Sequence, residues 1–451
     1  MKLHIQIPKN NQHERKYILE IIILEILGIE YSIEFIQTEY YEFCFGENKS
    51  LKVKDSFFNK FPEPNSYLNK KNIPDSIHFI TNDLTAEDNM PLIYGDGETS
   101  YNQNEIVTNA DIFSSTFYML SRWEEYVCTE MDEHDRFDEK KSLAVKNNFI
   151  YRPVVNEYIE YFWNALVYIG YSGKRKKRNF DLLLTHDIDH LVKWKKMKIY
   201  LQDVYKNLKK PKSVIQVTKS YISTLYDNKN DPFNTWDYLM DQSEKIGIKS
   251  HFYFMTGGTS KYDNRYEVNS KIVKNLIAKI YSRKHHIGIH PSYNSYNNSH
   301  LFELEKKKLE GIFDKEKITS GRQHYLRFKV PDTWQIWNDL GMEWESTMTY
   351  GKTSGFRCGI CYPFKVFNIV TRKKLNLIEK PLIFMEQTFI GYQRLSPKEM
   401  EEVAFNLLKK VKKYNGIFVL LWHNSSFNTP QMLEYRDVYS SILNKYLELK
   451  K

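Results

Sequence analysis

The segment Phe180-Asp-Leu-Leu-Leu-Thr-His-Asp-Ile-Asp-His190 joins a short apolar run to a cluster of polar residues. The run Leu182–Leu184 is long enough for a buried strand and too short for the apolar face of a helix. Asp187 and Asp189 follow it at the position where parallel α/β folds bind their ligands. Two carboxylates at i and i+2 suit a metal ligand and a base that acts on water. The same pattern also fits a polar loop in which one aspartate caps the next helix.

Length and composition indicate a globular protein of more than one domain. A chain of 451 residues predicts two or three domains, and 41% hydrophobic residues are enough for their cores. Much of the net charge of +9 lies in Lys174–Arg178 and Lys193–Lys212. Such clusters can meet acidic glycans, nucleic acid or a membrane surface, or can form a solvated helix face. The sequence contains no zinc finger or base-reading motif, so we expect no nucleic-acid partner.

Cysteine usage and hydropathy indicate a cytoplasmic protein. Four cysteines in a chain this long argue against a disulfide scaffold. Cys358 and Cys361 form a CxxC without the second pair that a structural zinc site needs, so we expect reduced thiols. Ile21–Leu27 is apolar but is interrupted by Glu25 and lacks a cleavage site, so no secretory signal is predicted. No window reaches the roughly 18 uninterrupted apolar residues of a transmembrane segment.

The order of predicted helices and strands divides the chain in two. Residues 1–172 are interpreted as a mixed α/β accessory domain, with a helix from Asp111 to Tyr126 capped by Asp111. Within that helix, Arg122 and Glu124 are expected to form interdomain or helix-end pairs. In residues 173–451 helices and strands alternate, after a basic helical insertion near 191–232. This alternation predicts a parallel α/β barrel.

Polar residues gather at four predicted strand ends of the second domain. They are Asp187 and Asp189, then His290, then Arg322 with His324 and Tyr325, and finally His423. An aspartate and imidazoles can bind a divalent ion, while a second carboxylate acts as a base and another histidine as an acid. Together these groups suit the hydrolysis of an amide or an ester.

These segments resemble the motifs of the polysaccharide deacetylase superfamily, which contains the NodB-homology domain and is carbohydrate esterase family 4-like. The resemblance covers residues 180–445 and rests on four stretches: Thr185-His-Asp-Ile-Asp189, His286-Ile-Gly-Ile-His290, Arg322-Gln-His-Tyr325 and Leu420-Leu-Trp-His-Asn424. The first is similar to the family's Thr-Phe-Asp-Asp motif and the third to its Arg-Pro-Pro-Tyr motif. The N-terminal region resembles the uncharacterised domain that precedes such deacetylases in bacterial surface-glycan gene clusters.

The resemblance implies a distorted (β/α) barrel, a divalent metal, zinc in particular, and a role for each motif residue. The implied roles are Asp187 as general base, Asp189 and His290 as metal ligands, Arg322 as the group that orients Asp187, the backbone N–H of Tyr325 as an oxyanion donor, and His423 as the acid for the leaving amine. The implied function is removal of an N-acetyl group from an acetamido sugar of a surface polysaccharide or of its precursor, including a lipid- or nucleotide-linked one.

One ligand of the family's motif is missing. Asn294 stands where the family has a second metal-binding histidine, four residues after His290. His324 lies two residues after Arg322 and would point to the same side of an extended segment, so we predict it as the third ligand. Asn294 or water could instead complete the shell, and His324 could bond substrate or be structural. Without a third ligand the protein would be an inactive glycan-binding barrel.

Substrate contacts are predicted next to these strand ends. The glycine-rich loop Thr349–Pro363 presents Arg357, which we expect to bind an anionic or carboxylate part of the substrate, or else to pair with Glu345 or a neighbouring acid. Trp344 and Trp422 could stack on a sugar face or could belong to the core. A small amide or an O-acetyl ester remains an alternative substrate.

Overall fold

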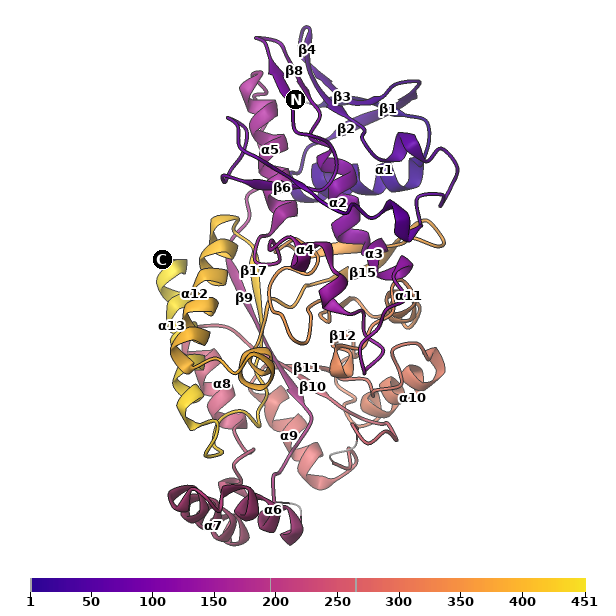
Figure 1. Cartoon of the computed structure of the whole chain (residues 1–451). Coiled ribbons are helices and arrows are strands. Elements are labelled where there is room, and N and C mark those ends of the chain that lie inside the picture. The colour runs from indigo at the N-terminus through magenta and orange to yellow at the C-terminus, as the bar shows by residue number, and fades with distance from the viewer. Residues whose placement is uncertain (1, 195, 264–265) are drawn as a thin grey trace.

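A computed structural model describes residues 2–194, 196–263 and 266–451 (Figure 1). The N-terminal region contains a six-stranded sheet in the order β2-β1-β3-β4-β8-β7 and a separate β5-β6 pair. The strands are β1 (Leu3–Pro8), β2 (Tyr31–Ile36), β3 (Tyr40–Phe45), β4 (Lys49–Lys54), β5 (His78–Ile80), β6 (Met90–Leu92), β7 (Thr99–Tyr101) and β8 (Glu105–Thr108). The helices are α1 (Gln12–Leu19), continued by a π-helical segment (Glu20–Ile26), α2 (Ile112–Ser121), α3 (Trp123–Val127), α4 (Leu143–Lys146) and α5 (Val154–Tyr168).

The helix predicted from Asp111 to Tyr126 is present as two helices. Asp111 caps α2 as predicted, because its Oδ1 accepts a hydrogen bond of 2.9 Å from the Ser114 N–H. Arg122 then adopts a left-handed conformation with φ 53°, which ends α2 and starts α3. Its guanidinium pairs with Glu124 and donates to the Tyr350 hydroxyl at 3.0 Å. The prediction that Arg122 forms interdomain or helix-end pairs is confirmed.

The second region is built on a nine-stranded sheet in the order β14-β15-β13-β12-β11-β10-β9-β17-β16. All neighbours are parallel except β14 and β15. The strands are β9 (Asp181–Ile188), β10 (His251–Phe254), β11 (His286–Ile289), β12 (Ser320–Gly321), β13 (Trp344–Glu345), β14 (Phe364–Asn368), β15 (Lys373–Glu379), β16 (Phe384–Met385) and β17 (Ile417–Leu421). In the described part of the chain β14 and β16 each have one neighbour, so the sheet is an open, curled half-barrel. The predicted distorted (β/α) barrel is therefore seen in part, as this half-barrel without closure in the described residues.

Helices follow the strands and cover the outside of this sheet. They are α8 (Trp236–Lys245), α9 (Lys271–Ser282), α10 (Ser299–Glu310), α11 (Asp332–Asp339), α12 (Pro397–Lys413) and α13 (Arg436–Lys450). In Figure 1, α8, α12 and α13 stand along the β9–β17 side, and α10 and α11 lie on the β11–β12 side. Two more helices, α6 (Met197–Asn207) and α7 (Pro211–Tyr226), form a hairpin at the end of the molecule remote from the N-terminal sheet. Across the described residues, none of the helices has both the length and the apolar character needed to cross a membrane.

The strand register brings the ends of the central strands to one level. Ile188 of β9 pairs with Phe254 of β10, which pairs with Ile289 of β11. Ile289 in turn pairs with Gly321 of β12. The residues that follow these strands therefore meet at one edge of the sheet, as parallel α/β folds require of their ligand sites.

The two regions share one continuous hydrophobic core and are joined by polar contacts. Arg372 donates both to Oε1 and to Oε2 of Glu14 at 2.8 Å, and the Tyr17 hydroxyl donates to the Lys365 carbonyl at 2.9 Å. We keep 1–172 and 173–451 as proposed units that are packed on each other rather than loosely linked.

The strands β11 and β12 approach each other closely at Gly321. A Cβ atom at this position would lie 1.9 Å from the Ile289 carbonyl oxygen, a backbone atom that cannot rotate away. Only glycine fits here, and the close approach brings His290 and Arg322 side by side at the strand ends.

We predict that Gly321→Ala destabilises the protein by about 1–3 kcal/mol, because the two strands must separate to admit the methyl group. Thermal unfolding followed by circular dichroism measures the effect. Gly311→Ala is the matched control: its Cβ would meet backbone atoms no closer than 3.4 Å, so its melting temperature should stay near that of the parent. Equal melting temperatures for the two variants would contradict the close approach.

Candidate metal and catalytic site

A pocket of about 440 Å³ opens where the parallel strands end. Asp187 and Asp189 enter it from β9, His290 from β11 and His423 from the segment after β17. His324, Tyr325 and Leu326 line it from the turn that follows β12. All the polar residues predicted at four separate strand ends, apart from Arg322, therefore line one cavity.

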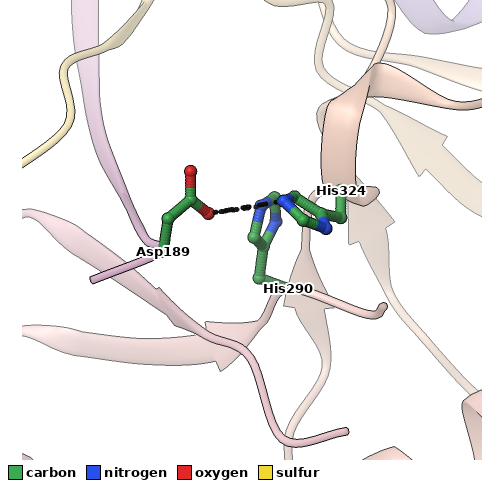
Figure 2. A group of neighbouring side chains, drawn as sticks. All are labelled: Asp189, His290 and His324. Atoms are coloured by element: carbon green, nitrogen blue, oxygen red, sulfur yellow. Dashed lines mark ion pairs between the residues drawn. The ribbon is translucent and has the colours of Figure 1, made fainter. Parts of the chain in front are cut away.

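Asp189, His290 and His324 form a group that can hold a metal ion (Figure 2). One ligand atom from each side chain lies within 4.8 Å of the other two. Oδ1 of Asp189 is 3.4 Å from Nε2 of His290 and 3.7 Å from Nε2 of His324. This oxygen is buried and makes no hydrogen bond to any described residue. A carboxylate with two imidazoles is a donor set typical of catalytic zinc sites, so these residues fit the metal that the motifs imply.

Both imidazoles of this triad are held by their other ring nitrogen. Nδ1 of His290 lies 2.7 Å from the Arg322 carbonyl oxygen, and Nδ1 of His324 lies 2.9 Å from Oδ1 of Asp263. A carbonyl oxygen only accepts, so Nδ1 of His290 carries a proton and Nε2 is the ring nitrogen that faces Asp189. Burial lowers the pKa of His324 more than Asp263 raises it, which favours the neutral imidazole that binds metals.

Asp187 lies beside the triad and is fixed by Arg322. Nη1 of Arg322 donates to Oδ1 of Asp187 at 2.8 Å, and both side chains are buried. The same guanidinium donates through Nε to the Ser346 carbonyl at 2.6 Å and through Nη2 to the Ser346 hydroxyl at 3.1 Å. The other carboxylate oxygen of Asp187 is 3.9 Å from Nε2 of His290. Asp187 is thus a carboxylate held in fixed orientation next to, but separate from, the candidate ligands.

His423 faces the triad from the other side of the pocket and is paired with Glu386. Nδ1 of His423 lies 2.7 Å from Oε1 of Glu386, and its Nε2 is 3.8 Å from Asp189. Burial alone would lower the pKa of His423, but Glu386, together with Asp189, raises it to about 10. A protonated imidazole held by a carboxylate and aimed into a cavity is arranged as a general acid.

Tyr325 is held in a left-handed conformation by the N-terminal region. Its φ is 60°, and its carbonyl accepts a hydrogen bond of 3.0 Å from Nη1 of Arg136. Arg136 also lines the pocket and is paired with Asp132. Nearby, Nε of Arg327 donates to the His134 carbonyl at 2.8 Å. The segment 132–136 therefore clamps the turn that contains His324 and Tyr325.

Three predicted substrate contacts lie away from the pocket. Arg357 is buried in a two-point pair with Glu125, with Nε–Oε1 at 2.9 Å and Nη2–Oε2 at 2.5 Å. The alternative prediction, that it pairs with an acid, is therefore confirmed with Glu125 in place of Glu345, and its assignment as a substrate ligand is corrected. Trp344 is packed against His251 and lies under the Lys380 ammonium. Trp422 is fully buried against Tyr439. Both tryptophans belong to the core, which corrects their assignment to a sugar-binding face.

Asn294 is not the third ligand. Its side chain is exposed, and its Oδ1 accepts a hydrogen bond of 3.2 Å from Arg327. His324, which was our choice from the sequence, is the residue that joins Asp189 and His290.

Three residues near the site were missed by sequence reasoning. Glu386 follows β16 directly, so the rule that polar residues follow apolar strands could have found it. Asp263 and Arg136 lie in irregular segments with no such signal. Their roles depend on contacts with His324 and Tyr325 that are distant along the chain.

Comparisons with known proteins give a family model for the N-terminal region and similar solved structures. A model described as "Family of unknown function (DUF7033)" matches residues 3–170. No curated protein matches the chain. A candidate polysaccharide deacetylase from Mycobacterium smegmatis has 11% identity and a TM-score of 0.39, covering 60% of this chain and 85% of its own. A candidate polysaccharide deacetylase involved in O-antigen biosynthesis, from Bordetella bronchiseptica, has 13% identity and a TM-score of 0.29, covering 61% and 85%. At these scores the similarity does not define residue correspondences.

We predict that His324→Ala lowers zinc affinity by more than about 100-fold, because a ligand is lost rather than a supporting residue. Isothermal titration of the chelator-treated protein with zinc measures the affinity. Asn294→Ala is the matched control and should bind zinc like the parent. The opposite ranking of the two variants would assign the third position to Asn294.

We predict that Glu386→Gln lowers the pKa of His423 from about 10 toward its ordinary value near 6.5. A folded-state pKa above the unfolded value stabilises the protein fully below pH 6.5, and this contribution disappears as the pH rises to about 10. The difference in melting temperature between parent and variant should therefore be largest at and below pH 6.5 and smallest near pH 10. An NMR titration of the metal-free protein gives the pKa directly, and an unchanged value would refute the role of Glu386.

Proposed function

We propose that this chain is a metal-dependent hydrolase that removes an N-acetyl group from an acetamido sugar of a surface polysaccharide or its precursor. One observation supports it above the others. A carboxylate fixed by arginine (Asp187) and a histidine fixed by glutamate (His423) flank the same candidate metal triad within one pocket. Base, metal site and acid are the three elements that hydrolysis of an unactivated amide needs.

The candidate metal site would supply the electrophile. A divalent cation, zinc in our proposal, would be bound by Asp189, His290 and His324. When bound, such a cation polarises the acyl carbonyl and lowers the pKa of water.

The protein's own residues perform the proton transfers. Asp187 takes the proton of the attacking water, since Arg322 keeps one of its oxygens occupied and orients the other toward His290. The backbone N–H of Tyr325, in the turn clamped by Arg136, is our proposed donor to the developing oxyanion. His423, protonated beside Glu386, gives its proton to the leaving amine.

The pocket is suited to a sugar ring of modest size. Its volume of about 440 Å³ is within the range of small-molecule sites. Tyr392 lines it and is 43% exposed, so it provides the aromatic face that we had assigned to the tryptophans. The four unpaired cysteines support our proposal of a cytoplasmic location.

The sequence motifs support the acetamido sugar as substrate over the two alternatives. An inactive glycan-binding barrel was motivated by the missing second histidine, and the closeness of His324 to Asp189 and His290 supports a complete set of ligands instead. An O-acetyl ester has less need of a protonated His423 beside Glu386, because an alkoxide leaves more readily than an amine anion.

We predict that Asp187→Asn lowers kcat for acetate release by about 10²–10⁴, the contribution of general base catalysis. The assay measures acetate from nucleotide- and lipid-linked acetamido sugars and from O-acetyl esters. Zinc content is the control: Asp187 is not a ligand, so the variant should bind the metal like the parent. Equal acetate release by variant and parent would refute the proposed base, and release from esters alone would change the substrate class.

A further inference from the structure

The helical hairpin α6–α7 exposes apolar side chains that nothing in the fold covers. Eight of the 21 large hydrophobic residues that are exposed in the described chain lie in it. They are Met197, Leu201, Tyr205, Leu208, Ile215, Ile222, Leu225 and Tyr226, with exposed fractions from 47% to 88%. An exposed apolar patch of this kind marks an interaction surface.

The inner faces of the two helices account for the stability of the hairpin without these side chains. Tyr200 of α6 stacks on Tyr221 of α7 with ring centroids 4.3 Å apart, and Trp194 packs edge-on against both. The two ends of the hairpin segment are joined by Asp231, whose carboxylate accepts hydrogen bonds from the backbone N–H groups of Lys193 and Trp194. The outer faces are therefore free to serve another purpose.

Lysines alternate with the exposed apolar residues on these outer faces. Lys212, Ile215, Lys219, Ile222 and Tyr226 follow one another in steps of three or four, so they share one face of α7. The segment 191–232 holds ten lysines, three aspartates and no arginine, a net charge of +7 in a chain whose total is +9. Only Lys193 of this segment forms an ion pair in the described residues, with Asp203.

We propose that the α6–α7 hairpin docks the protein on an anionic lipid surface. Lipid bilayers are the partner that accepts both kinds of side chain: aliphatic and tyrosine side chains enter the interface while lysines meet anionic headgroups. A nucleic acid would pair with the lysines and leave exposed leucine and isoleucine without a partner. A second copy of the hairpin would place lysines opposite lysines.

The hairpin also lies close to the candidate site along the chain. His190 lines the pocket, and α6 starts seven residues later at Met197. Asn424, next to His423, donates to the His190 carbonyl at 2.8 Å, which ties the start of this segment to the site. Docking through the hairpin would hold the pocket near the membrane surface, where a lipid-linked glycan is found.

Sedimentation of the full chain with vesicles tests the proposal without any enzymatic assay. The parent should sediment with vesicles that contain phosphatidylglycerol and stay in solution with phosphatidylcholine alone, and high salt should weaken the binding. Replacement of Lys209, Lys210 and Lys212 by Gln should weaken binding about tenfold or more. The same change at Lys306, Lys307 and Lys308 of α10 is the charge-matched control and should bind like the parent.

A second pair of variants tests the apolar contribution. Leu201→Glu on α6 should abolish sedimentation, while Leu304→Glu on α10, at a residue of similar exposure, should not. Circular dichroism and the melting temperature check that each variant is folded. A parent that remains in solution with anionic vesicles would overturn the proposal. Equal binding by the Leu201→Glu and Leu304→Glu variants would also overturn it. So would a dimer of the parent that Leu201→Glu dissociates when no vesicle binding is seen, or lysine-dependent binding to RNA and not to vesicles.

Discussion

The buried guanidinium of Arg322 connects three strand ends of the sheet. It starts from β12, pairs with Asp187 at the end of β9 and donates twice to Ser346 after β13. A buried ion pair of this kind adds little net stability, but removal of one partner costs about 3–5 kcal/mol because the other charge stays buried. The pair is best understood as a device that fixes Asp187 beside the triad. The same strand end provides the carbonyl that orients His290.

The N-terminal region takes part in this arrangement rather than only preceding it. Arg136 supports the carbonyl of Tyr325 and lines the pocket, and Arg327 reaches back to the His134 carbonyl. The turn between them holds His324, which Asp263 orients from another segment. The position of His324 in the candidate triad therefore depends on contacts from three separate parts of the chain.

Sequence reasoning found the residues whose position follows from strand periodicity. Asp187, Asp189, His290 and His423 each follow an apolar run, and parallel strands in register bring such positions together. Strand periodicity could not predict which residue a side chain pairs with. Arg357 finds its carboxylate in Glu125, 232 positions away, and no local pattern contains that information. Trp344 and Trp422 flank the site in sequence, but their side chains point into packed layers. Closure of the barrel was also not predictable, since it depends on the edge strands β14 and β16.

The most direct test of this account is a crystal structure of the zinc-loaded protein with anomalous scattering recorded at the zinc edge. The account predicts one strong peak at about 2.0–2.2 Å from Asp189, His290 and His324, with Asp187 still paired to Arg322. A peak bound by Asn294 or by Asp187, or no peak within this pocket at saturating zinc, would contradict it.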